Sequence, residues 1–138
     1  MKLQSRTLSV SIDAPAVAVY LFASDPLNMP KWAAGLGSSI SKIDGRWMVE
    51  TPSGVVTVEF APTNNLGVLD HTVTLGDGTR IYMPMRVIAN GEGAELVLTL
   101  YRQAGMSDAQ FERDAGLVQK DLVTLKRRVE ALKHDQGA

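Results

Sequence analysis

Cysteine is absent from this chain of 138 residues, which excludes disulfides, thiolate metal ligands and cysteine nucleophiles. An excess of either charge is also absent, because 14 basic and 15 acidic residues leave a net charge of −1. Such a balance argues against nucleic acid or an anionic membrane surface as a partner. No stretch approaches the roughly 20 apolar residues of a membrane span, and residues 1–13 lack the apolar core of a signal peptide. These absences predict a cytoplasmic protein without membrane insertion.

Internal repeats and Pro/Gly/Ser linkers are missing as well, so the length predicts a single domain over residues 1–138. Polar and apolar residues alternate over residues 7–12, which indicates a half-buried first strand. Asp13, with Pro15 close behind it, is the expected cap of a short helix. The segment Ser24 to Pro26 repeats this signal and predicts a second short helix that reaches Trp32 and ends at the glycines at positions 35 and 37.

Residues 38–102 consist of short alternating runs separated by turn residues, the pattern of six strands in an antiparallel meander. A long helix follows from Ser107, where Gln110 three residues later completes a capping box. Its apolar positions fall on one stripe. The expected architecture is α+β: a curved antiparallel sheet of six to seven strands around a long C-terminal helix, with two short helices after the first strand.

Hairpin geometry assigns the strand side chains to faces, because directly opposite residues point the same way. The turn positions predict three facing pairs: His71 with Met83, Trp47 with Val58, and Met85 with Leu98. One face is then almost wholly apolar. Joining the strand that ends at Phe60 to the strand that begins at Leu69 requires a bulge or an irregular corner between residues 61 and 67. This face is broader than one helix of about 10–12 Å diameter can fill. Two alternatives remain open: Met83 and Met85 line a pocket, or they fill gaps in a solid core.

The sequence resembles the START-like or SRPBCC superfamily, which includes the polyketide cyclase/dehydrase branch. The likeness covers nearly the whole chain and is carried by VSIDAPAVAVYLFASDPLNMPKWAAGL, GRWMVETPSGVVTVEF, GVLDHTV, PMRVIANGEGAELVLTL and FERDAGLVQKDLVTLKRRVEAL. The resemblance implies a helix-grip fold with a hydrophobic ligand cavity between the sheet and the C-terminal helix. It brings no catalytic signature, since the superfamily shares a cavity rather than a reaction.

His71 is the one ionisable residue that the pairing places on the apolar face. It could orient a ligand's carbonyl or hydroxyl group or transfer a proton, and the alternative is a core histidine satisfied by a neighbour. Asp70 points to the opposite face, which disfavours a catalytic Asp-His pair. The candidate ligand-binding residues are Trp32, Trp47, Val58, His71, Met83, Met85, Leu98, Phe111, Val118 and Leu122.

Arg86 is expected on the outer face, although a bulge beside Pro84 would turn it inward to bind a carboxylate. Tyr82 and Tyr101 are expected to face each other on the outer surface, where they mark either a homodimer contact or ordinary surface. No metal or other cofactor is predicted, because His134 lies at the end of the last helix and no carboxylate clusters with His71.

The leading functional hypothesis is therefore a module that binds a small apolar molecule. An enzyme of the polyketide cyclase/dehydrase type, with His71 as general acid or base, is the first alternative. A protein-interaction module that works through its surface is the second.

Overall fold

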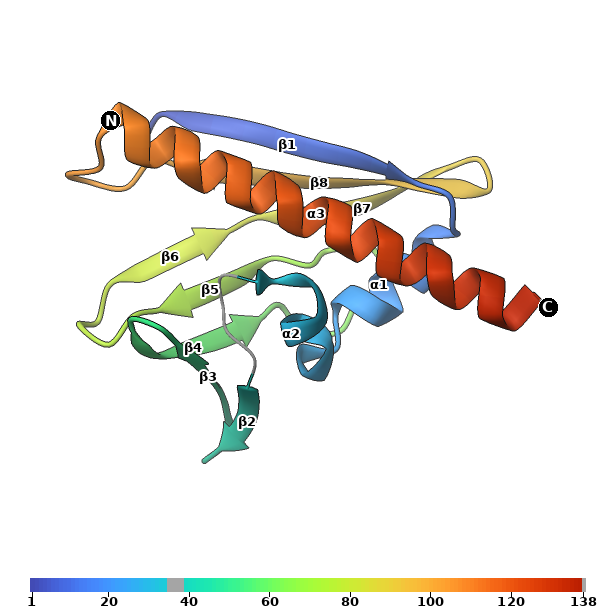
Figure 1. Ribbon diagram of the computed structural model, residues 1–138, viewed down its shortest axis with the longest axis horizontal. Coiled ribbons are helices and arrows are strands. Elements are labelled where there is room, and N and C mark those ends of the chain that lie inside the picture. Colours follow the sequence, from blue (N-terminus) through green and yellow to red (C-terminus); the bar gives the residue numbers. More distant parts are fainter. Residues whose placement is uncertain (35–38, 138) are drawn as a thin grey trace.

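The computed structural model describes residues 1–34 and 39–137, with side chains described up to residue 132 in the last helix. The described residues form two antiparallel sheets, three helices and one short 3-10 turn (Figure 1). The three-stranded sheet has the order β1-β8-β7, with β1 (Ser5–Ile12), β7 (Met85–Asn90) and β8 (Gly93–Tyr101). The five-stranded sheet follows chain order: β2 (Ser39–Ile43), β3 (Arg46–Thr51), β4 (Gly54–Phe60), β5 (His71–Thr74) and β6 (Arg80–Met83). The expected α+β helix-grip arrangement is confirmed.

The predicted strand register is confirmed where hairpin turns define it. Trp47 pairs with Val58, His71 with Met83, and Met85 with Leu98. The structure differs from the expected single sheet of six to seven strands in one respect, because the strand is broken at Pro84, between β6 and β7. Proline has no backbone N–H to donate to a ladder. As a result β6 ends in one sheet and β7 begins in the other, which gives eight described strands.

The short helices are α1 (Ala16–Ala23), η1 (Pro26–Asn28) and α2 (Met29–Trp32). Asp25 caps η1 as predicted, since its carboxylate accepts the Leu27 N–H at 3.0 Å. The prediction that Asp13 caps α1 is wrong, because Pro15 occupies the N-cap position and no side chain caps this helix. The predicted helix end at the glycines at positions 35 and 37 lies outside the described residues.

The chain crosses between the sheets through an irregular corner, as the sequence requires. Gly67 adopts φ +75°, and its carbonyl accepts the Val87 N–H at 2.9 Å. A Cβ atom at Gly67 would lie 2.2 Å from the Val87 carbonyl oxygen. Only glycine permits this close approach of the corner to β7.

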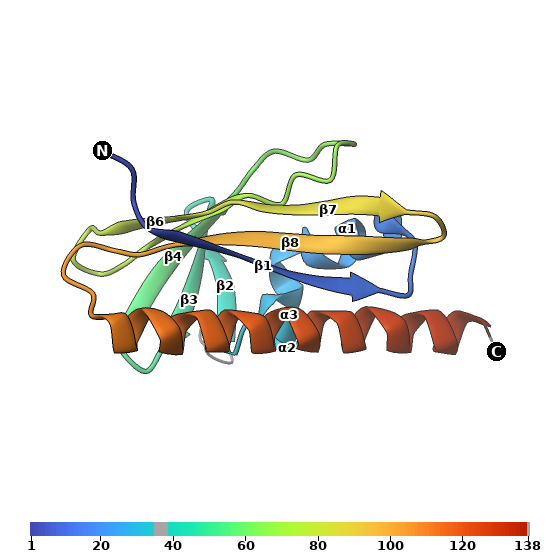
Figure 2. The ribbon, with the colours of Figure 1, turned by 90° about the horizontal axis from the view of Figure 1, so that it is seen from above.

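The helix α3 (Asp108–Gly137) begins at the predicted capping box, where Ser107 and Gln110 exchange hydrogen bonds of 2.9 and 3.2 Å. It runs along β1, α2 and α1 rather than along the middle of the five-stranded sheet (Figure 2). Its enclosed side chains are Phe111, Ala115, Leu122, Leu125 and Val129. The three-stranded sheet and α3 therefore enclose most of the core.

Candidate ligand site

The inner faces of the two sheets differ in how completely they are covered. On β7 and β8 the inward side chains are buried, including Met85 and Leu98. On the five-stranded sheet several inward apolar side chains are only half-buried. We call this set the inner strip: Trp47, Phe60, Ile81 and Met83. The position of α3 along β1 leaves the inner strip as partly accessible apolar surface.

His71 lies beside the inner strip and is the one buried ionisable residue in the described part of the chain, with 4% of its surface exposed. Its Nδ1 lies 3.0 Å from the Leu69 carbonyl oxygen. Its ring lies 5.1 Å from the Phe60 ring at an interplanar angle of 36°. Burial lowers the pKa of the imidazole, more than the Leu69 carbonyl and the charge of Asp70 raise it. The ring is therefore neutral at neutral pH.

Trp32 ends α2 and is 4% exposed, so it lies in the core. Its indole Nε1 is sealed from solvent and has no hydrogen-bond partner, alone among the buried side-chain nitrogens and oxygens of the described residues. An unpartnered buried donor costs about 1–3 kcal/mol. Such an atom calls for a functional explanation.

The other predicted site residues fall into two groups. Val58, Met85, Leu98, Phe111 and Leu122 are sealed in the core. Trp47, Met83 and Val118 keep accessible surface, and the first two belong to the inner strip. The ammonium of Lys42 lies 5.6 Å from the centre of the Trp47 ring, at the β2 side of the sheet.

Arg86 lies on the outer face as expected, with 51% of its side chain exposed. Its guanidinium binds Asp70 through hydrogen bonds of 3.0 and 2.9 Å. Asp70 also accepts the Tyr82 phenol and the Met85 N–H, each at 2.8 Å. The hydrogen bonds from Arg86 are the main reason that the pKa of the Asp70 carboxyl falls to about 2. Arg86 and Asp70 thus bind each other on the outer face, where neither can contact a ligand on the inner face of the sheet.

Asp121 on α3 is a titratable group that the sequence pattern did not single out. One carboxylate oxygen accepts the Ala34 N–H at 3.2 Å, which ties α3 to the end of α2. Burial raises the pKa of this carboxyl to about 6, against the opposing effects of that hydrogen bond and Lys120. Acidic residues on an amphipathic helix usually face solvent, so the helical pattern alone does not distinguish Asp121 from its neighbours.

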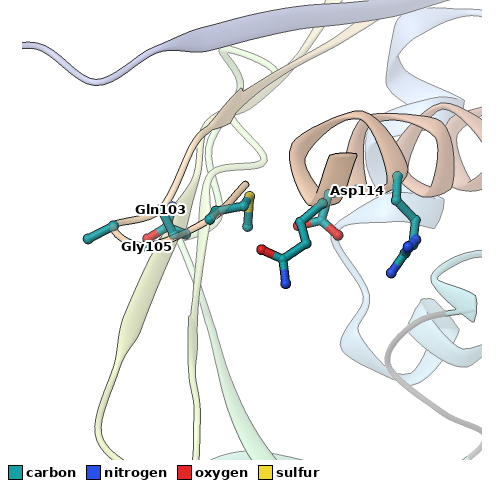
Figure 3. Close-up of a pocket in the computed structure, with 7 residues that line it drawn as sticks. Gln103, Gly105 and Asp114 are labelled. Carbon is teal, nitrogen blue, oxygen red and sulfur yellow. The ribbon is translucent and has the colours of Figure 1, made fainter. Parts of the chain in front are cut away.

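Surface depressions lined by described residues border these elements. One of about 360 Å³ lies between the β8–α3 connection and the first turns of α3, with Gln103 and Gly105 on one side and Asp114 on the other (Figure 3). It also includes Met106, whose half-buried side chain packs against the core. A second, of about 580 Å³, borders β3, β4, β5 and β6, where Trp47, Val58 and Phe60 line it together with Thr57, Thr74 and Arg80.

The third depression, of about 470 Å³, is an apolar groove between α1, the corner and β7. The exposed side chains of Val17, Leu21 and Leu66 line it, and it contains none of the predicted site residues. Within the described residues, no three histidine, aspartate or glutamate side chains are grouped to hold a metal ion. No described helix has the length and apolar character needed to cross a membrane.

Comparison with known proteins gives structural matches only. No family model and no curated protein sequence matches the chain. A START superfamily protein from Mycobacterium smegmatis is 16% identical with a TM-score of 0.68, and the alignment covers 93% of this chain and 98% of that one. The ZhuI aromatase/cyclase from Streptomyces sp. R1128 is 15% identical with a TM-score of 0.69 and 94% of both chains covered.

An uncharacterised protein from Bacillus thuringiensis is 13% identical with a TM-score of 0.74, and the alignment covers 91% of this chain and 98% of that chain. A START superfamily protein and an aromatase/cyclase therefore both align over nearly the whole of this chain at low sequence identity. Likeness at this level of identity establishes architecture and leaves activity to the site itself. The chain has the helix-grip fold of these structures.

Proposed function

We propose that this protein binds a small, largely apolar molecule against the inner strip, between the five-stranded sheet and α3. The observation that carries the proposal is unused hydrogen-bonding capacity inside an apolar core. His71 makes one hydrogen bond, to Leu69, and the Trp32 indole makes none within the described residues. A guest with a polar atom would pair with the second ring nitrogen of His71.

The half-buried inner strip supports the same proposal. Apolar side chains that point inward and still keep accessible surface lose solvent contact when an apolar guest covers them, which contributes about 25 cal/mol per Å². Met83 lies directly opposite His71 across the β5–β6 pair, so a flexible apolar side chain and the polar imidazole lie next to each other. Methionine adapts to ligands of different shape.

The enzyme alternative has less support in the geometry. Proton transfer by a histidine is usually assisted by a group that orients the ring or stabilises its charge. Asp70 is adjacent in sequence but binds Arg86 and Tyr82 on the outer face. The proposal is therefore a binding module.

Native mass spectrometry of the protein incubated with a mixture of sterols, fatty acids and aromatic metabolites tests the proposal. We expect a one-to-one adduct with the wild type. Met83→Trp fills the inner strip and removes the adduct, whereas Val55→Trp, at an exposed position on the outer face of β4, retains it. Absence of any adduct, or equal loss in both variants, would contradict binding at the inner strip.

A further inference from the structure

We propose that the bound molecule presents a hydrogen-bond donor, a hydroxyl or an N–H group, to Nε2 of His71, so that the site selects neutral alcohols and phenols over ethers and carboxylates of the same shape. This inference rests on the proposed function and specifies its ligand. It follows from the tautomer of one ring.

The contact with Leu69 fixes the tautomer. A backbone carbonyl oxygen accepts hydrogen bonds and has no proton to donate, so the Nδ1 atom 3.0 Å away carries the proton. In a neutral imidazole the second nitrogen then has a lone pair and no proton. The apolar surroundings of His71 disfavour a second proton on the ring. Nε2 is therefore a hydrogen-bond acceptor.

Nε2 also borders accessible space. In the described part of the chain no group hydrogen-bonds to it, yet it is not sealed from solvent as the Trp32 Nε1 atom is. The ring adjoins Phe60 and lies opposite Met83, and both side chains belong to the inner strip. An apolar molecule that covers the strip thus brings its own polar atoms next to a lone pair.

The charge distribution excludes an anionic end at this position. Among the described residues no lysine or arginine is buried with His71. Lys42 stacks on Trp47 at the β2 side, and Arg86 is held outside by Asp70. A carboxylate at Nε2 would meet a lone pair after losing its water, which is strongly unfavourable. An ether oxygen is neutral but has no proton to donate.

Three probes of one ring system separate these cases: 2-naphthol, 2-methoxynaphthalene and 2-naphthoate. By titration calorimetry at neutral pH we expect 2-naphthol to bind the wild type about 10-fold or more tightly than either of the others, because each of the others loses the hydrogen bond and leaves Nε2 unpaired. His71→Phe keeps an aromatic ring without the acceptor, so the preference for naphthol over its methyl ether disappears.

The outcomes distinguish this inference from the proposed function. Equal affinity of the wild type for 2-naphthol and 2-methoxynaphthalene overturns the inference and leaves apolar ligand binding intact. Failure of all three probes to bind overturns both. If His71→Phe does not fold, His71→Asn replaces it, because the asparagine side-chain N–H takes the place of Nδ1–H toward Leu69 and supplies no atom at Nε2.

A measurement on the wild type is independent of both variants. Long-range ¹H–¹⁵N spectra of the His71 ring distinguish its tautomers at neutral pH. The inference expects a protonated Nδ1 and an unprotonated Nε2. An Nε2–H tautomer or an imidazolium ring would overturn it.

Discussion

The carboxylate of Asp70, just before β5, binds the guanidinium of Arg86 on β7 and so joins the two sheets where Pro84 separates them. The same carboxylate accepts the Met85 N–H, which begins the strand after the break. Asp70 thus provides at the break the acceptor that a continuous ladder would have supplied. This ion pair holds the charges of Asp70 and Arg86 on the outer face, away from the His71 ring.

Loss of this pair is expected to destabilise the fold. Arg86→Gln removes two charge-assisted hydrogen bonds, and we expect a loss of about 1 kcal/mol in the free energy of unfolding after allowance for the exposure of Arg86. The control is Arg80→Gln, because Arg80 contacts Glu59 only at 4.0 Å with both side chains mostly exposed. The control should change stability by less than about 0.5 kcal/mol. Urea unfolding followed by tryptophan fluorescence checks this, and equal losses would contradict a special role for Arg86.

The corner at Gly67 provides a second prediction. Gly67→Ala places a methyl group against the Val87 carbonyl and strains a positive φ, whereas Gly78→Ala strains a φ of +90° with open space around it. Strain alone costs about 1–2 kcal/mol, so Gly67→Ala should cost clearly more than Gly78→Ala. Thermal unfolding of the two variants measures the difference. A larger loss in Gly78→Ala would show that the corner does not approach β7 as described.

Asp121 makes stability depend on pH in a direction unusual for a carboxylate. Its pKa is about 6 in the folded chain and about 3.9 when unfolded, so the folded state binds the proton more tightly. The contribution of Asp121 to stability is then greatest below about pH 4 and is lost as pH rises through 6. Asp121→Asn removes this penalty and should stabilise the protein at pH 7.5 by up to about 1 kcal/mol, after a discount for partial exposure, with little effect at pH 4. Urea unfolding at both pH values checks it; a destabilised variant at pH 7.5 would contradict the account.

His71 gives the opposite dependence. Burial lowers the pKa of its folded form, so the unfolded chain takes up the proton first as pH falls through about 6.5. The wild type should therefore lose stability between pH 7.5 and pH 5 relative to His71→Phe, in which this proton uptake is absent. Comparing the two proteins cancels the contributions of Asp121 and other shared groups. A constant difference across this range would contradict a buried neutral ring.

Much of the fold was predictable because turn residues set the strand register. His71 reached the inner face opposite Met83 because the hairpin between β5 and β6 allows one pairing. The capping box at Ser107 likewise needs only local chemistry. The break at Pro84 also had a local signal, since proline rarely interrupts a ladder without ending it.

The candidate site was less predictable, because coverage of the inner face depends on where α3 lies. The helical stripe predicts which side of α3 is apolar but not that α3 follows β1. In that position of α3, Met85 and Leu122 are buried and Met83 stays partly accessible, although the sequence pattern predicts an inward-facing apolar side chain at all three positions. The unpartnered indole of Trp32 and the half-buried carboxyl of Asp121 are tertiary effects of the same kind.

The central claim is that a guest occupies the inner strip, and methionine methyl NMR tests it most directly. Met83 belongs to the strip, whereas Met48 lies on the outer face, where its sulfur contacts the Thr57 hydroxyl at 3.6 Å. In protein labelled at the methionine methyl groups and titrated with 2-naphthol, we predict a saturable shift of the Met83 signal through the ring current and a stationary Met48 signal. A stationary Met83 signal, or a shift confined to Met48, would contradict the account.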